Sequence, residues 1–401
     1  MNHPLPAAFS VETSSLFTPW CDPLSGVESF VLQRRVAPLQ QSFYYTTPSF
    51  TDDGRYLWFY CGFPPAGNAN YGRTLAVVDF ERQEIRHYPE TQFLDASPAV
   101  DLRTGEAYWC TGPEIWKRGP LVDASPELVN RLPAEIVRGR RPWRIATHLT
   151  FSADRKALAI DAEIGREWFV GCAPLDGTPV EIWARPTRAY NHAQFCPDPR
   201  NGDLILVNQD SSTDPVTGEC PNYENRMWLL RRDHPLRPLY PDAQAAVAHM
   251  HGHEWWSADG RHVWYIHYGR GVMRVNPFIP NPESEPGTTS GPAGNPEPEN
   301  IWPLDYVSHA HTSADETLVV ADCFPGPRTG PAKVAFLNRA TGRTADIVTH
   351  MPYPPEPLPR YHAHPHPQFC YGDRYICYTT FVHGRSDLAL TPVSRLLEAT
   401  A

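Results

Sequence analysis

The chain has 401 residues, a formal net charge of −10, 41% hydrophobic residues and 12% aromatic residues. This composition supports a large core and excludes wholesale disorder, and the acidic balance argues against a nucleic-acid partner. The 44 prolines and 26 glycines predict many turns and short elements in place of long helices. The nine cysteines form no Cys-x-x-Cys pair, so we interpret them as reduced, buried thiols.

The first residues, MNHPLPAAFSVETSSLF, have neither the basic segment nor the apolar run of a signal peptide. No later stretch approaches the roughly 18 apolar residues that a membrane helix needs. We therefore expect a cytoplasmic protein without a membrane partner. Residues 28–38, ESFVLQRRVAP, follow with the pattern of a strand.

From Thr47 onward, one strand–turn–strand pattern recurs along the chain. In its first copy, TPSFTDDGRYLWFY, an aromatic residue precedes a turn at Asp53-Gly54 and an apolar run follows it. The residues three positions before the aromatic position are Thr47, Ser97, His148, His192, His253, His309 and His366. Their nearly regular spacing, close to the length of one four-stranded repeat, is typical of propeller blades.

We therefore predict an all-β fold, a seven-bladed β-propeller that forms a single domain over residues 1–401. Residues 28–38 would supply the strand that closes the last blade. Two segments interrupt the pattern. Residues 125–141 begin with a possible capping box and predict a short helix, and residues 281–301, rich in Pro, Gly, Ser and Glu, predict a flexible loop insertion.

Five of the seven equivalent positions are histidine. Because the first strand of each blade lines the channel of a propeller, these five side chains would converge on one level around the axis. Histidine makes up only 17 of the 401 residues, so chance is a poor explanation. The alternative is a structural role, in which each ring bonds to the backbone of a neighbouring blade. We favour a polar pocket, in which His148 and His192 bind substrate.

The segment YHAHPHPQF, residues 361–369, adds two histidines beside His366. In an extended strand, alternation places His362, His364 and His366 on one face, where they could serve as metal ligands. The alternative is a polar loop, and the two interleaved prolines argue against an ordinary central strand. Imidazole together with oxygen ligands suits Mn, Fe, Ni, Cu or Zn better than Mg.

Three further features carry weaker signals. Arg226, in NYENRMWLLRRD, could face an anionic ligand or lie exposed at a blade edge. Glu254 alternates to the face opposite His253, and we interpret it as structural. The run HMHGH, residues 249–253, could form a second metal cluster, although we expect its first two histidines in the loop that enters the blade.

Several segments resemble the oligogalacturonate lyases of bacteria: GHEWWSADGRHVWYI, SHAHTSADETLVVAD, NHAQFCPDP with NRMW downstream, and HPHPQF. The resemblance extends from about Tyr44 to the last blade. It implies a cytosolic seven-bladed propeller that cleaves short pectin fragments by β-elimination. It also implies a divalent metal, most often Mn²⁺, that binds the uronate carboxylate and stabilises the charge formed when the C5 proton leaves.

The resemblance also implies roles for individual residues. His253 matches the base, Arg226 matches an arginine near the substrate carboxylate, and His309, His364 and His366 match metal ligands. Members of the family carry a glutamine ligand three residues before the first histidine of HPHP, where this chain has Tyr361. Either His362 replaces the amide, water fills the position, or the metal differs.

The leading hypothesis is a metal-dependent lyase that acts on short, anionic uronate oligosaccharides. The first alternative is a non-catalytic propeller that binds a partner or a sugar on its flat face, which predicts scattered histidines. The second is another metal-dependent carbohydrate-active enzyme, such as a different uronate lyase, a hydrolase or an epimerase. The sequence carries no dimer motif, and the resemblance leaves a homo-oligomer open.

Overall fold

The computed structural model describes residues 10–211, 217–220, 224–241, 250–278, 296–324, 331–353 and 358–401. Within these ranges no helix has the length and apolar character needed to cross a membrane. The cytoplasmic location stays a prediction. Of the predicted loop insertion at 281–301, residues 281–295 lie outside the described residues. The prediction is wrong at its end, because Glu299–Trp302 form strand β22.

Seven sheets follow one another along the chain and are the blades of a seven-bladed β-propeller, so the predicted fold class is confirmed. The six four-stranded sheets are β3–β6 (Leu39–Gln41, Tyr56–Gly62, Arg73–Asp79, Glu84–Phe93), β7–β10 (Ala99–Val100, Ala107–Thr111, Glu114–Arg118, Glu127–Arg131), β11–β14 (Pro142–Arg144, Ala157–Ile164, Glu167–Pro174, Glu181–Ala184), β15–β18 (Tyr190–Phe195, Leu204–Gln209, Met227–Arg231, Arg237–Pro238), β19–β22 (His251–Trp256, Val263–His267, Gly271–Val275, Glu299–Trp302) and β23–β26 (Val307–Thr312, Leu318–Cys323, Ala332–Asn338, Arg343–Met351).

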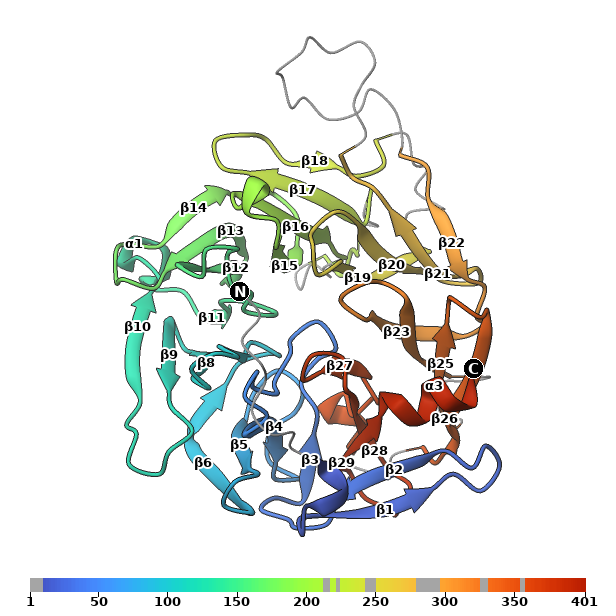
Figure 1. Cartoon of the computed structure of the whole chain (residues 1–401). Helices are drawn as coiled ribbons and strands as arrows, with labels where there is room; N and C mark the ends of the chain where they lie inside the picture. Colours follow the sequence, from blue (N-terminus) through green and yellow to red (C-terminus); the bar gives the residue numbers. More distant parts are fainter. Residues whose placement is uncertain are drawn as a thin grey trace. The chain divides into compact units, whose positions relative to one another are not determined.

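The seventh sheet joins the two ends of the chain. Its strand order is β27 (Gln368–Cys370), β28 (Tyr375–Thr380), β29 (Asp387–Pro392), β2 (Glu28–Leu32) and β1 (Phe17–Cys21). Strand β2 pairs with β29 at Phe30–Leu390 and Val31–Ala389, and Figure 1 shows these strands side by side, β2 in blue and β29 in red. Strand β1 adds a fifth, outer strand that the sequence pattern did not predict.

Helices are few and short in the described part of the chain. They are α1 (Ala134–Val137), α3 (Val393–Ala399) and the 3₁₀ turns η1 (Val11–Thr13), η2 (Pro199–Asn201) and η3 (Leu358–Tyr361). The helix predicted within residues 125–141 is reduced to the single turn of α1, because strand β10 occupies the start of that segment. The predicted capping box is wrong, since Pro133 is the N-cap and makes no side-chain cap bond.

One hydrogen-bonded turn explains the repeat seen in the sequence. In four sheets a Ser or Thr hydroxyl donates to the Asp two residues later: Thr51 to Asp53 (2.6 Å), Ser152 to Asp154 (2.7 Å), Ser257 to Asp259 (2.8 Å) and Ser313 to Asp315 (2.7 Å). The residue after each Asp has a left-handed backbone: Gly54, Arg155, Gly260 and Glu316, with φ of 73°, 61°, 69° and 59°. Glycine adopts this conformation without steric penalty, and the side-chain bond fixes the turn around the two bulkier residues.

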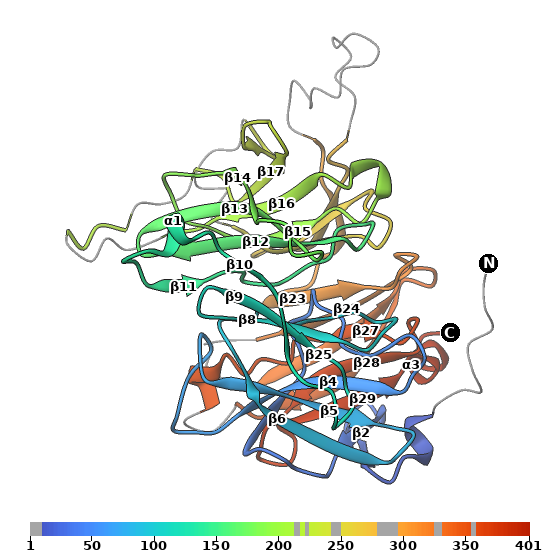
Figure 2. The same cartoon turned by 90° about the vertical axis from the view of Figure 1, so that its left-hand side faces the viewer.

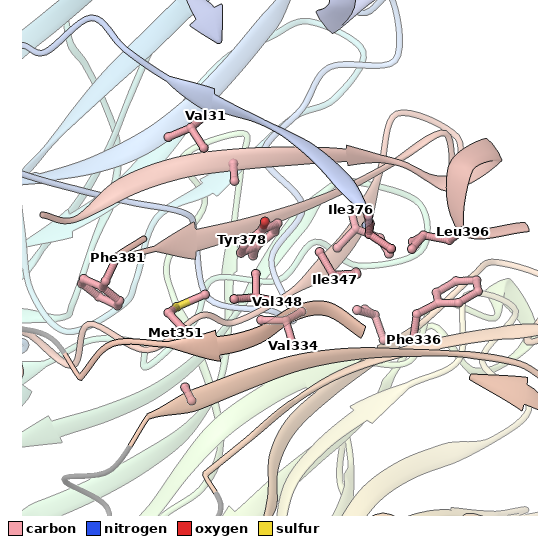
Figure 3. Packing of buried hydrophobic residues seen from close by; sticks show 14 of the residues in the cluster. Val31, Val334, Phe336, Ile347, Val348, Met351, Ile376, Tyr378, Phe381 and Leu396 are labelled. Carbon is pink, nitrogen blue, oxygen red and sulfur yellow. The ribbon is translucent and has the colours of Figure 1, made fainter. Parts of the chain in front are cut away.

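The chain divides into two compact units. The first comprises residues 1–111, 116–128 and 306–401, and the second comprises residues 112–115 and 129–305. The prediction of a single domain stays a prediction. In the first unit, side chains of β25, β26 and β28 pack against one another and against Leu396 of α3, as Figure 3 shows for Val334, Val348 and Ile376.

In the second unit, β12 and β13 form a long antiparallel pair of eight residue pairs (Figure 2). Its core includes Leu206 of β16 and Tyr265 of β20, both almost fully buried. All nine cysteines of the chain are free thiols. Seven are buried as expected, but Cys21 and Cys220 are exposed, so the prediction of buried thiols is wrong for these two.

Candidate active site

Four histidines converge in the first unit. His309 comes from β23, and His362, His364 and His366 come from the segment between η3 and β27. One ring nitrogen of each lies within 4.8 Å of those of the others. The ring centroids of His309 and His366 are 4.3 Å apart, and those of His362 and His364 are 4.2 Å apart. We call these four residues the histidine cluster.

The three neighbouring histidines do not lie on one face of a strand, so that interpretation is wrong. Their segment has no regular secondary structure between Tyr361, where η3 ends, and Gln368, where β27 begins. His362 and His366 have positive φ values of 53° and 44°. The rings converge because the backbone turns at these two residues, and such left-handed conformations in non-glycine residues are concentrated at functional sites.

The buried carboxylate of Asp322, which no sequence motif indicated, fixes the orientation of His309 in the cluster. Both oxygens of Asp322, in β24, lie 3.0 Å from Nδ1 of His309, and they also accept from the backbone N–H groups of His309 (2.8 Å) and His366 (3.1 Å). Because the carboxylate accepts these bonds, the Nδ1 of His309 donates and its Nε2 presents a lone pair to a cation. Burial raises the pKa of Asp322 to about 7, while His364 and the two backbone N–H groups act in the opposite direction.

Two buried tyrosines pack against the histidine cluster on one side. The ring of Tyr44 lies 4.9 Å from that of His366, and the ring of Tyr45 lies 5.4 Å from that of His309. Both tyrosines are buried, at 7% and 1% exposure. They limit the rotation of the two imidazoles and keep water from that side of the cluster.

The donor set fits a divalent transition metal. Nε2 of His309, Nδ1 of His364 and Nε2 of His366 are buried atoms, whereas the side chain of His362 is exposed. A metal–imidazole bond is about 2.0–2.1 Å long, so two nitrogens on opposite sides of one ion lie about 4 Å apart. Nitrogens within 4.8 Å of one another can therefore bind one ion after small ring rotations. Neutral imidazoles with a carboxylate behind one of them form a common transition-metal site.

The second unit holds a buried ion pair beside three of the repeat histidines. Nε of Arg226 donates to Oε1 of Glu254 over 2.9 Å, and Nη1 of Arg226 lies 3.6 Å from Oδ1 of Asp210. The side chain of Glu254 is fully buried, and that of Arg226 is 10% exposed. Burial raises the pKa of Glu254, and Arg226 acts in the opposite direction. Glu254 therefore has the structural role predicted for it, and that role is to hold the guanidinium of Arg226.

His148 and His192 lie against each other, with ring centroids 4.9 Å apart in an edge-to-face arrangement. Nδ1 of His192 bonds to Oδ1 of Asn191 over 2.7 Å. Burial, followed by the electrostatic effect of the neighbouring His148, Arg226 and other groups, holds the pKa of His192 well below its ordinary value. His192 is therefore neutral at neutral pH and can exchange hydrogen bonds with hydroxyl groups.

His253 occupies a distorted position in β19. Its φ is 51°, and the register of β19 against β20 shifts between Gly252 and Trp255. Nδ1 of His253 lies 3.0 Å from the hydroxyl oxygen of Tyr268. A Cβ atom at Gly252 would lie 2.6 Å from that same oxygen, so a side chain there would displace the hydroxyl of Tyr268 from its present position. Bulges of this kind redirect side chains near active sites. We call His148, His192, Arg226, His253 and Glu254 the Arg226 cluster.

The structure thus brings the predicted residues together in two groups. His309, His364 and His366 meet in the first unit with His362, and His148, His192, Arg226 and His253 gather in the second. The convergence of all five repeat histidines on one level stays a prediction. The first histidine of the HMHGH run, at position 249, lies outside the described residues. His251 belongs to strand β19, so its predicted place in a loop is wrong.

No family model matches the sequence, and no curated protein matches it. Two solved structures of oligogalacturonate lyases share its fold. One, in complex with manganese, has a TM-score of 0.70 at 16% identity, covering 94% of this chain and 96% of that one. The other, from Vibrio parahaemolyticus, has the same TM-score, identity and coverage. A β-propeller domain from Myceliophteria thermophila has a TM-score of 0.51 at 10% identity, covering 86% of this chain and 97% of that one. At these identities the likeness shows the fold, and at that level the resemblance found in the sequence is confirmed.

Proposed function

We propose that this chain is a metal-dependent lyase that cleaves short oligogalacturonate-type chains by β-elimination and releases unsaturated uronates. The observation that carries the proposal is the convergence of His309, His364 and His366, backed by Asp322, in a chain with the fold of oligogalacturonate lyases. Three imidazoles come from two separate segments, and a buried carboxylate fixes one of the rings. Together they form a preorganised set of metal ligands. A non-catalytic scaffold has no need for this arrangement.

His309, His364 and His366 are the proposed metal ligands, and Mn²⁺ is the metal named for one of the structural neighbours. A bound divalent cation supplies positive charge that offsets a uronate carboxylate and so makes the C5 proton more acidic. The ligands themselves are neutral. Asp322 holds the ring of His309 in one tautomer and one orientation, which reduces the rearrangement needed for binding.

Arg226 is the proposed partner of the substrate carboxylate in the second unit. Its Nε donates to Glu254 and its Nη1 donates to the carbonyl of Gln209 over 3.4 Å, and these bonds fix the plane of a guanidinium whose charge would attract an anion. The same ion pair compensates the charge of the arginine, whose side chain is only 10% exposed. An anionic sugar then gains a charged hydrogen bond that a neutral sugar does not.

His253 is the proposed base. A neutral imidazole is a competent base near neutral pH, and its Nε2 takes the C5 proton. The C5–H electron pair becomes the C4–C5 double bond, the C4–O bond breaks, and the leaving oxygen takes a proton from solvent. His148 and His192 are the proposed partners of the sugar hydroxyls, and the lowered pKa of His192 keeps its ring neutral for that role.

The first experiment follows the ultraviolet absorbance of the unsaturated product with digalacturonate as substrate. The protein is assayed as purified, after treatment with EDTA, and after the return of Mn²⁺. Loss and recovery of the absorbance change, with recovery absent in His366→Ala, supports the proposal. The exposed His350 lies outside both clusters, so His350→Gln is the matched control. Stoichiometric metal without any absorbance change on oligouronates would contradict the lyase and favour another metal-dependent enzyme.

A further inference from the structure

We propose that His362 is a fourth ligand, so that the metal is held by four imidazole nitrogens, and that this set favours a later divalent metal such as zinc, nickel or copper over manganese. The inference deepens the proposed function by naming the class of metal. It rests on that function only for what the metal does to substrate, because the ligand set can be tested without any turnover.

The position of His362 places it among the donors. Its ring centroid lies 4.2 Å from that of His364, 5.1 Å from that of His366 and 6.1 Å from that of His309. It stacks on His366 with an angle of 18° between the planes. Its side chain is exposed while His309 and His366 are buried, so it completes the histidine cluster from the solvent side.

The backbone holds His362 in this place. Its φ of 53° lies in the left-handed region, where a histidine persists only if its surroundings fix it. The N–H of His362 donates to the carbonyl of Pro359 over 3.1 Å, and its own carbonyl accepts from the N–H of His364 over 2.9 Å. The buried Gln41 donates from Nε2 to the same carbonyl over 3.3 Å. These contacts turn the chain so that the ring faces the other three.

Three oxygen-bearing side chains around this segment have partners of their own. Tyr361 is 0% exposed, and its hydroxyl donates to the carbonyl of Ala66. The side-chain oxygen of Gln41 accepts from Nη1 of Arg73 over 3.4 Å. The carboxylate of Asp322 accepts from Nδ1 of His309 and from the backbone N–H of His366. Among the His, Cys, Asp and Glu side chains of the described residues, the group that could share one ion here consists of four imidazoles and includes no carboxylate.

A donor set of four nitrogens has a defined metal preference. Imidazole suits zinc, copper, iron and nickel, whereas manganese binds best where carboxylate, carbonyl or water oxygens supply most ligands. The affinity of a nitrogen-rich site also rises from manganese towards copper. Four neutral ligands leave the charge of the ion uncompensated by its own ligands, which suits an anionic substrate.

The test uses the metal-free protein and three variants. His362→Gly removes the ring at a residue whose φ suits glycine, His362→Gln replaces the nitrogen donor by an amide oxygen, and His350→Gln is the surface control. Affinities for Zn²⁺, Ni²⁺ and Mn²⁺ are measured by competition with a chromophoric chelator. The nitrogen hyperfine pattern of bound Cu²⁺ counts the imidazoles on the ion. Circular dichroism and thermal unfolding verify that each variant is folded.

We expect four nitrogens on Cu²⁺ in the wild type and three in both His362 variants. We also expect His362→Gln to weaken the binding of Zn²⁺ and Ni²⁺ at least as much as the loss of an outer-shell partner does, roughly 10- to 100-fold. The binding of Mn²⁺ should change far less, because manganese accepts a carbonyl oxygen in place of the imidazole. Three nitrogens in the wild type, or unchanged affinities in both His362 variants, would overturn the inference. If the protein cleaves digalacturonate but the His362 variants bind metal as the wild type does, the proposed function holds and this inference fails. If four nitrogens bind Cu²⁺ in the wild type but the protein does not cleave digalacturonate, this inference holds and the proposed function fails.

Discussion

The carboxylate of Asp322 holds Nδ1 of His309 with both of its oxygens at 3.0 Å, and both groups are fully buried. The second unit contains a related bridge that consists of backbone bonds. Asp161 follows His148 at the same separation along the sequence as Asp322 follows His309. Asp161 accepts from the N–H of Thr147 over 2.7 Å and from that of Ala193 over 2.8 Å. Each aspartate thus ties the histidine segment of its own blade to that of the next, and Asp322 also bonds to an imidazole of the histidine cluster.

Asp322→Asn should lower the affinity for a divalent metal by roughly 10- to 100-fold, because the neutral amide polarises the ring of His309 less and orients it less firmly. The matched control is Asp161→Asn, which changes the corresponding bridge in the other unit and should leave metal affinity unchanged. Chelator competition gives the affinities, and thermal unfolding gives the stabilities. Equal losses of affinity in the two variants would mean a general loosening of the blades.

His253→Asn should lower kcat for elimination by roughly 10²- to 10⁴-fold, the range over which a general base contributes. Asparagine tolerates the left-handed backbone at this position, where φ is 51°, so the fold should persist. Metal content, measured by mass spectrometry, should stay at the wild-type level. Wild-type kcat in this variant would show that the base is another residue.

Tyr268→Phe should lower kcat by roughly 10-fold with little change in KM, because the phenolic oxygen lies 3.0 Å from Nδ1 of His253 and so fixes the ring and its tautomer. Phenylalanine keeps the ring packed over Gly252, so packing is conserved. The pH profile of kcat/KM should also shift, which a purely structural role would not cause. An unchanged profile together with an unchanged kcat would remove Tyr268 from the proposed mechanism.

The blades could be predicted from the sequence because their signal is local. A hydroxyl, an aspartate two positions later and a left-handed residue directly after it form one short turn, and that turn fixes the strands on both sides. The candidate ligands His309, His364 and His366 could be named because they occur in recognisable motifs. The structure also revealed that the three neighbouring histidines converge through left-handed turns and not through strand alternation.

The partners of these residues could not be predicted in the same way. Glu254 reaches Arg226 across 28 residues, and Asp322 reaches His366 across 44. No local periodicity reports such contacts, because each depends on how one blade packs on the next. The one available signal was that Asp161 and Asp322 occupy equivalent positions after His148 and His309. It becomes meaningful once the blades are aligned on their turns.

A buried histidine outside the proposed roles predicts how stability depends on pH. His251 is 6% exposed, and its ring lies 5.2 Å from that of His267 and 4.9 Å from that of Tyr265. Burial, with smaller contributions from His267 and Arg270, lowers the pKa of His251 from 6.5 to about 4. Between these values the unfolded chain binds a proton that the folded chain does not, so the free energy of unfolding rises with pH.

The shift corresponds to at most about 3.5 kcal/mol over the window from pH 4 to 6.5, since one pKa unit is worth about 1.4 kcal/mol. Urea unfolding of the metal-free protein across that window should show the rise. His251→Gln should show a shallower one, because glutamine keeps the polarity of the side chain and has no proton to gain. The exposed control His350→Gln should keep the wild-type slope. Identical slopes in the wild type and His251→Gln would mean that His251 is protonated in the folded protein as readily as in the unfolded chain.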